Sequence, residues 1–349
     1  DITSQLNPQW ELKAGGRLES FTMKSFSSGD ISTINTYLDQ NATIYTESAL
    51  AADPSLRKKR QRELAVRGAG GYGYDVDGNE ISSGVDGPRK PVFASAYVQN
   101  KFEFRDIVVN AGLRFESFDT KILAVSDFLN PAWDQNLNYF ANPDSAVTTQ
   151  DPLSLVLPRL SFSFPVTDKT VFYAMYGKYA QMPALNPLYA NTYGLAGGIS
   201  PISRSGSGGR VGMFVRPERT TQYELGIRQT LTDNFAFTVT GFYKDLRDQM
   251  TLRRQTNALN VPIFVAYKNE DFGTTKGLEL TLELRRTNRL QAKVNYTISD
   301  ARGSGSNPNS SSTAVSDEGT ARFPNFINPL DYDQTHRGSI FVDYRFAQE

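Results

Sequence analysis

The segment from Tyr97 to Asp119 alternates apolar and polar residues through two runs that meet at Arg105 and Asp106. Because the side chains of a β-strand point alternately to opposite sides, each run predicts a strand with one apolar and one polar face. The apolar face carries Val98, Phe102, Phe104, Ile107, Val109, Ala111, Leu113 and Phe115. The polar face carries Gln99, Lys101, Glu103, Asn110, Arg114 and Glu116. The pattern predicts a β-hairpin, and the fold must supply a suitable environment for each of its faces.

The same alternation recurs along the chain and predicts about ten strands. In one of them, leucines at alternate positions from Leu278 to Leu284 stand against Glu279, Thr281 and Glu283. The predicted strands cover residues 9–26, 92–104, 107–120, 155–165, 170–181, 219–231, 235–250, 274–284, 290–300 and 336–347. Strands in such number, with no comparable helical pattern, predict an all-β fold.

The residues that flank the short connections support antiparallel hairpins. In a hairpin, residues on either side of the loop pair with each other and share a face. Three of these pairs are apolar on both sides: Phe104 with Ile107, Leu231 with Phe235, and Leu284 with Leu290. A fourth, Phe164 with Val171, fits less well because it assigns Phe172 and Tyr176 to the polar face. The hairpins therefore keep one apolar face on one side of the sheet.

Short and long connections alternate strictly between the predicted strands. The short ones are 105–106, 166–169, 232–234 and 285–289, and the long ones are 27–91, 121–154, 182–218, 251–273 and 301–335. Antiparallel strands of about 10–17 residues, with short turns at one end and long loops at the other, are typical of outer-membrane barrels. A soluble β-sandwich also alternates, but it does not need this difference between its two ends. We therefore expect an antiparallel transmembrane β-barrel with short periplasmic turns and long extracellular loops.

Composition excludes several other classes of protein. Lys and Arg number 37 and Asp and Glu number 37, so no net charge favours binding to nucleic acid. No run approaches the roughly 18 consecutive apolar residues of a membrane-spanning helix. The chain has no cysteine and a single histidine, His336, which leaves little basis for thiolate or multi-histidine metal sites. We expect no enzymatic activity and no cofactor.

Five segments resemble barrel strands of TonB-dependent outer-membrane receptors, most closely a large branch found in Bacteroidetes-like bacteria. Characteristic of such barrels are Pro-Glu-Arg-Thr before Tyr223-Glu224-Leu225-Gly226, and the strand that begins Lys276-Gly277-Leu278-Glu279. The five segments are SAYVQNKFEFRDIVVNAGLRFESFD, LPRLSFSFPVTDKTVFYAMYGKYAQMP, PERTTQYELGIRQTLTDNFAFTVTGFYKD, NEDFGTTKGLELTLELRRTNRLQAKVNYTISDARG and PLDYDQTHRGSIFVDYRF. The resemblance covers most of the chain from about residue 90 onward.

The resemblance implies a barrel of about 22 strands around an N-terminal plug domain. We find about ten strands and no plug, so we expect residues 1–349 to be one partial barrel region of a larger receptor. Residues 27–91 would form a long extracellular loop insertion. A self-contained barrel of about ten strands is the alternative, whereas an open sheet of that size in lipid would leave two unpaired edges.

Aromatic residues in the long loops are the candidate ligand contacts: Tyr139, Phe140, Tyr189 and Tyr193. Exposed rings next to asparagines could stack on a sugar or hold a peptide, because loops on a rigid scaffold often carry function. The simpler interpretation is that these rings pack the loops against one another.

Two charged motifs in the first long loop have a functional and a plain interpretation. Asp75, Asp77 and Asn79 have the alternate spacing of a calcium loop but lack its distal glutamate, so a simple turn is the alternative. The run LRKKRQRELAVR predicts a short basic helix with Arg57, Lys58, Lys59, Arg60 and Arg62. It could contact lipopolysaccharide phosphates or another anionic partner, or form a solvated helix face.

We expect these residues to form the wall and outer mouth of a receptor that imports a scarce nutrient across the bacterial outer membrane. The charges predicted to face the lumen are Arg114, Glu116, Glu224, Arg228, Glu279 and Glu283, which would hold the plug, line the path or pair with one another. The expected partners are outer-membrane lipid and, through a plug outside this chain, a TonB-type energy-coupling complex. A surface lipoprotein or other assembly subunits are further possibilities. The alternatives are a structural subunit of a surface assembly, a passive porin and a soluble lectin-like sandwich. The substrate, whether siderophore, cobalamin, oligosaccharide or peptide, is left open.

Overall fold

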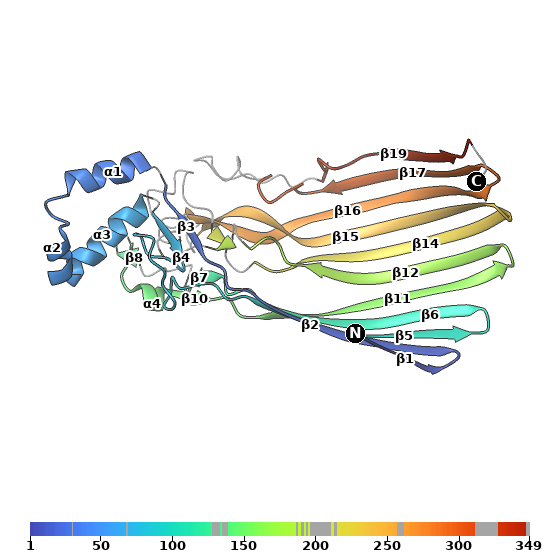
Figure 1. The fold of residues 1–349 in the computed structure, drawn as a ribbon, viewed down its shortest axis with the longest axis horizontal. Coiled ribbons are helices and arrows are strands. Elements are labelled where there is room, and N and C mark those ends of the chain that lie inside the picture. Colours follow the sequence, from blue (N-terminus) through green and yellow to red (C-terminus); the bar gives the residue numbers. More distant parts are fainter. Residues whose placement is uncertain are drawn as a thin grey trace.

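The computed structural model describes residues 1–29, 31–67, 69–127, 133–134, 139–185, 188–189, 192, 195, 211–212, 215–256, 262–310 and 327–346. Its main element is a 13-stranded sheet that runs along the length of the molecule (Figure 1). The long strands are β1 (Ile2–Asn7), β2 (Trp10–Ser20), β5 (Val92–Phe104), β6 (Ile107–Asp119), β11 (Leu153–Thr167), β12 (Thr170–Gln181), β14 (Glu218–Thr232), β15 (Phe235–Thr256), β16 (Pro262–Thr287), β17 (Leu290–Gly303) and β19 (His336–Tyr344). They are antiparallel neighbours in chain order, and β19 pairs with β17.

Tight turns join the strands at one end of the sheet, which we call the turn end (right in Figure 1). Residues 8–9, 105–106, 168–169, 233–234 and 288–289 make these two-residue connections. Arg105 (φ 55°) and Asn288 (φ 54°) adopt the left-handed backbone conformation that such turns require. The long connections meet at the opposite end, the loop end. The predicted antiparallel sheet and the difference between its ends are therefore confirmed.

The strand predictions fail in three places. β1 was not predicted, and the predicted strand 9–26 is split into β2 and the short β3 (Ser25–Ser27). The predicted long loop 251–273 is wrong, because β15 continues to Thr256 and β16 begins at Pro262. This extended hairpin leaves the regular wall of the sheet and buries Met250, Leu252 and Tyr267 among the loops. Its residues therefore follow a packing pattern different from that of a wall strand.

Of the four predicted hairpin pairs only Phe104 with Ile107 is confirmed. Phe235 pairs with Thr232 and not with Leu231, and Leu290 pairs with Thr287 and not with Leu284. The predicted register of the β11–β12 hairpin is wrong as well. Phe164 pairs with Phe172 and not with Val171, and Leu160 pairs with Tyr176. A bulge between Pro165 and Thr167 moves the register by one residue, which a proline favours because it cannot donate a ladder hydrogen bond. Phe172 and Tyr176 consequently lie on the apolar face, and the sheet keeps one apolar face across this hairpin as well.

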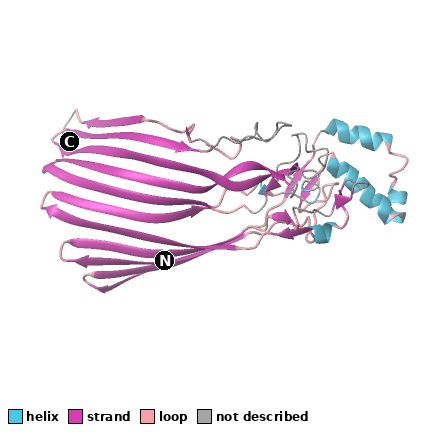
Figure 2. Cartoon of the chain, turned by 180° about the vertical axis from the view of Figure 1, so that it is seen from behind, coloured by secondary structure: helices cyan, strands magenta, loops and turns pink. Residues whose placement is uncertain are grey.

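The loop end carries a cap of short elements (Figures 1 and 2). It contains helices α1 (Ile31–Gln40), α2 (Glu47–Ala52), α3 (Pro54–Val66) and α4 (Pro143–Ala146), and two-stranded sheets of β3 with β4 (Gly70–Tyr72), β7 (Leu123–Val125) with β10 (Val147–Thr149) and β8 (Trp133–Asp134) with β9 (Tyr139–Phe140). The short strands β13 (Val211–Gly212) and β18 (Asn328–Pro329) join the main sheet there. No helix in the described part of the chain is long and apolar enough to cross a membrane.

The buried core lies in the cap and not along the sheet. One cluster of buried side chains joins Tyr72, Ile122, Leu188, Tyr189, Val215, Met250, Leu252 and Tyr267. On the sheet, by contrast, Leu225 is 56% exposed, Leu278 54% and Ile340 76%. In the described residues β1 pairs only with β2, and β19 only with β17. The sheet is therefore a partial barrel with two open edges.

Candidate functional site

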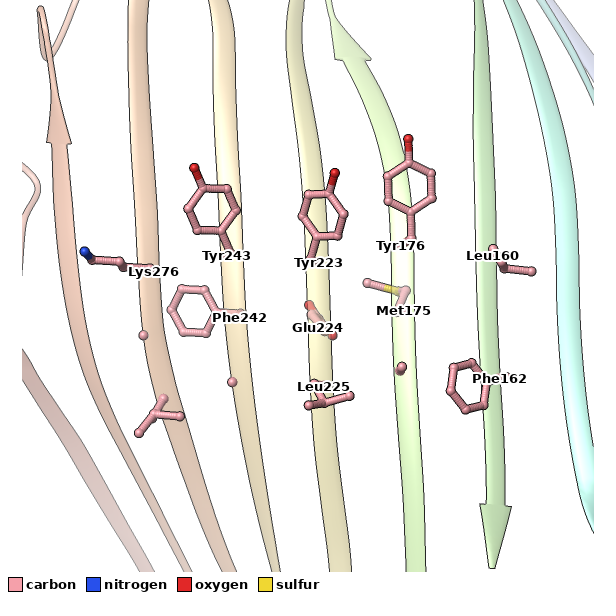
Figure 3. A pocket seen from close by; sticks show the side chains of 14 residues that line it. Leu160, Phe162, Met175, Tyr176, Tyr223, Glu224, Leu225, Phe242, Tyr243 and Lys276 are labelled. Atoms are coloured by element: carbon pink, nitrogen blue, oxygen red, sulfur yellow. The ribbon is translucent and has the colours of Figure 1, made fainter.

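The apolar face of the sheet ends in a row of tyrosines toward the loop end. Register places Tyr176 opposite Tyr223 and Tyr223 opposite Tyr243. Their ring centroids lie 5.2 Å and 6.2 Å apart in succession. Figure 3 shows the three hydroxyl groups pointing the same way, along the direction in which β12 runs toward the loops. Tyrosines arranged like this are typical of a membrane–water interface, where the ring is apolar and the hydroxyl reaches water.

A hollow of about 740 Å³ lies beside this tyrosine row (Figure 3). Its apolar lining includes Leu160, Phe162, Leu225 and Leu278, with Gly241 and Ala174 between them. The hollow forms because the small side chains of Gly241 and Ala174 lie between larger ones. Because its lining on this face is almost entirely hydrocarbon, the hollow suits lipid chains better than a polar ligand.

Register places all six charges predicted to face the lumen on the face opposite the tyrosines. Arg114 and Glu116 alternate with the apolar residues of β6, and the same holds for Glu224, Arg228, Glu279 and Glu283 on β14 and β16. We call this the polar face. The six residues thus share a face, as the sequence pattern predicts.

Ion pairs on the polar face form between residues two apart on one strand. Arg114 Nε lies 2.6 Å from Glu116 Oε1, and Glu116 has a side-chain exposure of only 13%. Lys101 with Glu103 and Arg17 with Glu19 repeat the arrangement. Because residues i and i+2 of a strand share a face, such pairs neutralise charge without reaching across strands. Glu116, Glu103 and Glu19 are therefore already paired, which the alternation of residues in the sequence does not show.

A second hollow, about 390 Å³, lies on the polar face, midway along the strands. Lys13, Arg114 and Arg159 supply its charges, and it also contains Tyr97, Gln99, Asn110 and Tyr179. The guanidinium carbon of Arg159 lies 4.6 Å from the centre of the Tyr179 ring. Tyr179 in turn covers Gly177, where an added Cβ would be 2.8 Å from the tyrosine hydroxyl. We call this the basic hollow. The hollow was not predicted, because its charges come from three different strands.

The loop aromatics predicted to contact ligand do not form an exposed site. Phe140 is 1% exposed and Tyr189 is 7% exposed. The Tyr189 hydroxyl donates a hydrogen bond to the backbone oxygen of Thr120 over 2.6 Å, and its ring meets Tyr72 edge-on with centroids 5.5 Å apart. The Tyr139 side chain and Tyr193 lie outside the described residues. For Phe140 and Tyr189 the structure favours packing between loops.

The calcium candidates form a turn with hydrogen bonds of its own. Asp75 Oδ1 accepts hydrogen bonds from the backbone nitrogens of Asp77 and Asn79, at 2.9 Å and 2.8 Å. The Asp77 carboxylate accepts hydrogen bonds from both terminal nitrogens of Arg60, each at 2.8 Å, and this pairing raises the pKa of Arg60. Within the described residues no group of three His, Cys, Asp or Glu side chains is placed to hold a metal ion. The geometry fits the plain turn.

The predicted basic helix exists as α3, and part of its charge is already paired. Arg60 binds Asp77, Arg62 lies 3.8 Å from Glu63, and Arg57 donates to the backbone oxygen of Leu50. Lys58 and Lys59 are exposed, and neither forms an ion pair with any residue that the structure describes. Arg57 also keeps its charge, because its partner is a backbone oxygen, so three of the five predicted cations form no ion pair with an acid that the structure describes.

A partly buried polar link ties the first loop to the third. The Asp86 carboxylate accepts hydrogen bonds from the Thr192 backbone nitrogen and hydroxyl, each at 2.6 Å. Burial raises the pKa of Asp86, against the opposing effect of the bonds from Thr192 and the charge of Arg89. Arg89 is 5% exposed and lies over the Tyr72 ring, 5.7 Å from its centre. The cap thus contains a carboxyl group whose protonation is coupled to loop packing.

Comparisons with known proteins agree with this geometry. The profile of the family described as TonB dependent receptor-like, beta-barrel matches residues 1–349. The FrpB iron transporter from Neisseria meningitidis (F3-3 variant) superimposes with a TM-score of 0.50 at 17% identity, over 86% of this chain and 34% of that one. The apoprotein of its F5-1 variant superimposes with a TM-score of 0.50 at 17% identity, over 88% of this chain and 36% of that one. A double mutant of the hemophore receptor HasR of Serratia marcescens, in complex with HasA and heme, has a TM-score of 0.47 at 14% identity, over 98% of this chain and 45% of that one. No curated protein matches the chain in sequence. The chain thus spans about a third of the length of FrpB.

Proposed function

Because the chain belongs to the TonB dependent receptor-like β-barrel family, we propose that it forms part of the wall and the outer cap of a receptor that imports a nutrient. The family is one of bacterial outer-membrane proteins, and the resemblance to a Bacteroidetes-like branch remains a prediction. One observation carries the proposal: the sheet exposes a continuous apolar face, while the buried core lies in the loops at one end. A protein in water would bury that face, whereas in a bilayer the lipid chains cover it and it can remain on the surface of the protein.

The two faces then have separate roles. The apolar face, with its tyrosine row, would contact lipid, and the hollow beside that row would accept acyl chains. The polar face would line the lumen with Arg114, Glu116, Glu224, Arg228, Glu279 and Glu283. Pairs such as Arg114–Glu116 support a wet lumen, because two charges on one strand remain compatible with water between strand and plug. The turn end would lie in the periplasm and the cap outside the cell.

Import of this kind requires parts outside the 349 residues. The open edges of β1 and β19 need further strands, since unpaired backbone groups in lipid are strongly unfavourable. A plug domain and a TonB-type complex would supply gating and energy. We assign the chain transport and no catalysis of its own, and the ring of its single histidine, His336, is hydrogen-bonded to Tyr296 over 2.7 Å. A surface lipoprotein on the cap is a further possible partner.

Uptake by the full-length receptor tests the proposal. Iron is the first substrate to try, because FrpB is an iron transporter. Cells that carry or lack the receptor would be supplied with radiolabelled iron complexes, with and without an uncoupler that removes the energy source. We expect receptor-dependent uptake that the uncoupler abolishes. Uptake or ion conductance that persists without energy would indicate a passive porin. If no substrate enters and the receptor co-purifies with surface proteins, a structural role replaces transport.

A further inference from the structure

The basic hollow gathers positive charge that the polar face does not neutralise. Register aligns Lys13 with Gln99, Gln99 with Gly112 and Gly112 with Arg159 across four neighbouring strands. The lining of the hollow contains three cations and no acidic side chain. Arg114 is bound to Glu116, but Lys13 and Arg159 form no ion pair with any residue in the described part of the chain. The nearby acid Glu11 stands opposite Lys101.

The glycine at the centre of this row makes the hollow. Gly112 lies between Gln99 and Arg159, and an added Cβ there would lie 3.2 Å from the Val98 oxygen. Strands in a sheet are about 4.8 Å apart, so three strand spacings separate Lys13 from Arg159 by about 14 Å. The two cations therefore stand on opposite sides of a recess of about 390 Å³, which is within the size range of small-molecule sites.

The aromatic residues of the hollow hold its arginine in place. The Arg159 guanidinium stacks on Tyr179, which covers Gly177 on the next strand. A guanidinium held over a ring can still donate paired hydrogen bonds to a carboxylate or phosphate. Gln99 and Asn110 add amide groups, and Tyr97 adds a second ring.

The hollow lies midway along the wall, because Gln99 and Gly112 are near the middle of β5 and β6, so a ligand that crosses the lumen from the loop end would pass it. We propose that the basic hollow binds a small anionic molecule through its carboxylate or phosphate groups. This inference rests on the proposed function, because it assigns a substrate class to the same wall. Recess size, stacked rings and amides favour a small molecule over an acidic segment of the plug.

Equilibrium binding to the full-length receptor in detergent tests the inference. Citrate and inorganic pyrophosphate serve as carboxylate and phosphate probes, sucrose as a neutral control, and binding is followed by titration calorimetry. We expect saturable binding of at least one anion and none of sucrose. The double variant K13Q/R159Q should weaken that binding by about tenfold or more, since each lost charge-assisted hydrogen bond is worth about a factor of ten.

Lys244 provides the matched control. It lies in the same register row, beyond Gly177 and Gln222, but outside the hollow. We expect K244Q to change anion affinity by less than about twofold, because charges more than a Debye length apart are largely screened by salt. Equal losses in K244Q and K13Q/R159Q would overturn the inference in favour of a diffuse field, and so would wild-type receptor that binds neither probe.

Two further outcomes separate the alternatives. If K13Q/R159Q binds anions like the wild type but gains ion conductance in planar bilayers, the cations hold an acidic protein segment and the inference fails. If wild-type receptor shows no energised uptake, the proposed function fails, while the binding experiment still decides the inference. If uptake is normal and anion binding is insensitive to K13Q/R159Q, only the inference fails.

Discussion

The sheet and the cap of this protein place their apolar residues in opposite ways. Along the sheet, large side chains such as Leu225 and Leu278 are more than half exposed, at 56% and 54%. In the cap, Ile122 and Leu252 are both 0% exposed. The same residue types therefore serve two solvents: the cap folds as a water-soluble protein does, whereas the sheet needs lipid to cover it.

The difference also separates two sources of stability. The cap gains from burying side chains of several loops against the extension of β15 and β16. The sheet gains from continuous backbone pairing between long neighbouring strands, which is the requirement for any structure in a bilayer. A substitution should therefore have different effects in the two regions, even where the residue type is the same.

The largest expected effect is in the cap. Leu252→Ala removes a side chain with 0% exposure from the buried cluster, and a buried Leu→Ala change costs about 2–5 kcal/mol. Hydrogen exchange of the full-length receptor should show faster exchange of cap amides, with the amides of β6 and β14 unchanged. Leu18→Ala, at a residue that is 73% exposed, serves as the control and should be within about 0.5 kcal/mol of wild type. Similar exchange in both variants would mean that the cap core is not a cooperative unit.

The next largest effect tests the apolar face of the sheet. Leu278→Arg puts a charge on the side assigned to lipid, where the cost of arginine rises from about 0–1 kcal/mol near the interface to about 2–4 kcal/mol at the bilayer centre. Thr297→Arg is the matched control, because Thr297 lies on the neighbouring strand, on the polar face, opposite Glu279. The readout is the amount of heat-resistant, folded receptor in isolated outer membranes. Equal yields of the two variants would contradict a lipid-facing role for Leu278.

The sheet could be predicted because alternation is a local signal. The bounds of β5 and the faces of β6 follow directly from the alternation between Val92 and Asp119. β1 was missed because its six residues place Ile2 and Leu6 around a serine, which is too short a pattern to distinguish from a loop. The β11–β12 register failed because a bulge at Pro165 shifts the pairing by one residue, and alternation carries no information about bulges.

The cap and the basic hollow could not be predicted because both depend on contacts between distant segments. The buried cluster draws Ile122 and Val215 from two connections and Leu252 from the extension of β15, and no alternation in the sequence links these segments. Tyr189 therefore looked like an exposed ligand contact, although it packs against the other loops. The hollow would have emerged from the sequence only by following the register from Lys13 through Gly112 to Arg159 with every hairpin correct.

A smaller effect is expected when a tyrosine hydroxyl is removed, and it should differ between the cap and the sheet. Tyr189→Phe leaves the buried backbone oxygen of Thr120 without its 2.6 Å hydrogen bond, which costs about 1–3 kcal/mol. Tyr223→Phe removes a hydroxyl from a residue that is 49% exposed, where water replaces it and the effect should be within about 0.5 kcal/mol. Exchange rates of cap amides measure the first variant, and thermal stability of the folded receptor measures the second. A larger loss from Tyr223→Phe would reverse the comparison.

The smallest effect is a pH dependence confined to the cap. Burial raises the pKa of Asp86 above that of the unfolded chain, although the hydrogen bonds from Thr192 oppose the shift. A raised pKa in the folded state means that the protonated carboxyl favours folding. This contribution is complete below the unfolded value of about 3.9 and is lost as the pH rises through the folded value.

Exchange of the Thr192 amide should therefore indicate a less stable link at neutral than at mildly acidic pH, after correction for intrinsic rates. Asp86→Asn cannot titrate and should remove this slope, while amides of the sheet show none in either protein. A slope that survives in the variant would assign the pH dependence to another group, and one of opposite sign would show that the bonds from Thr192 outweigh burial.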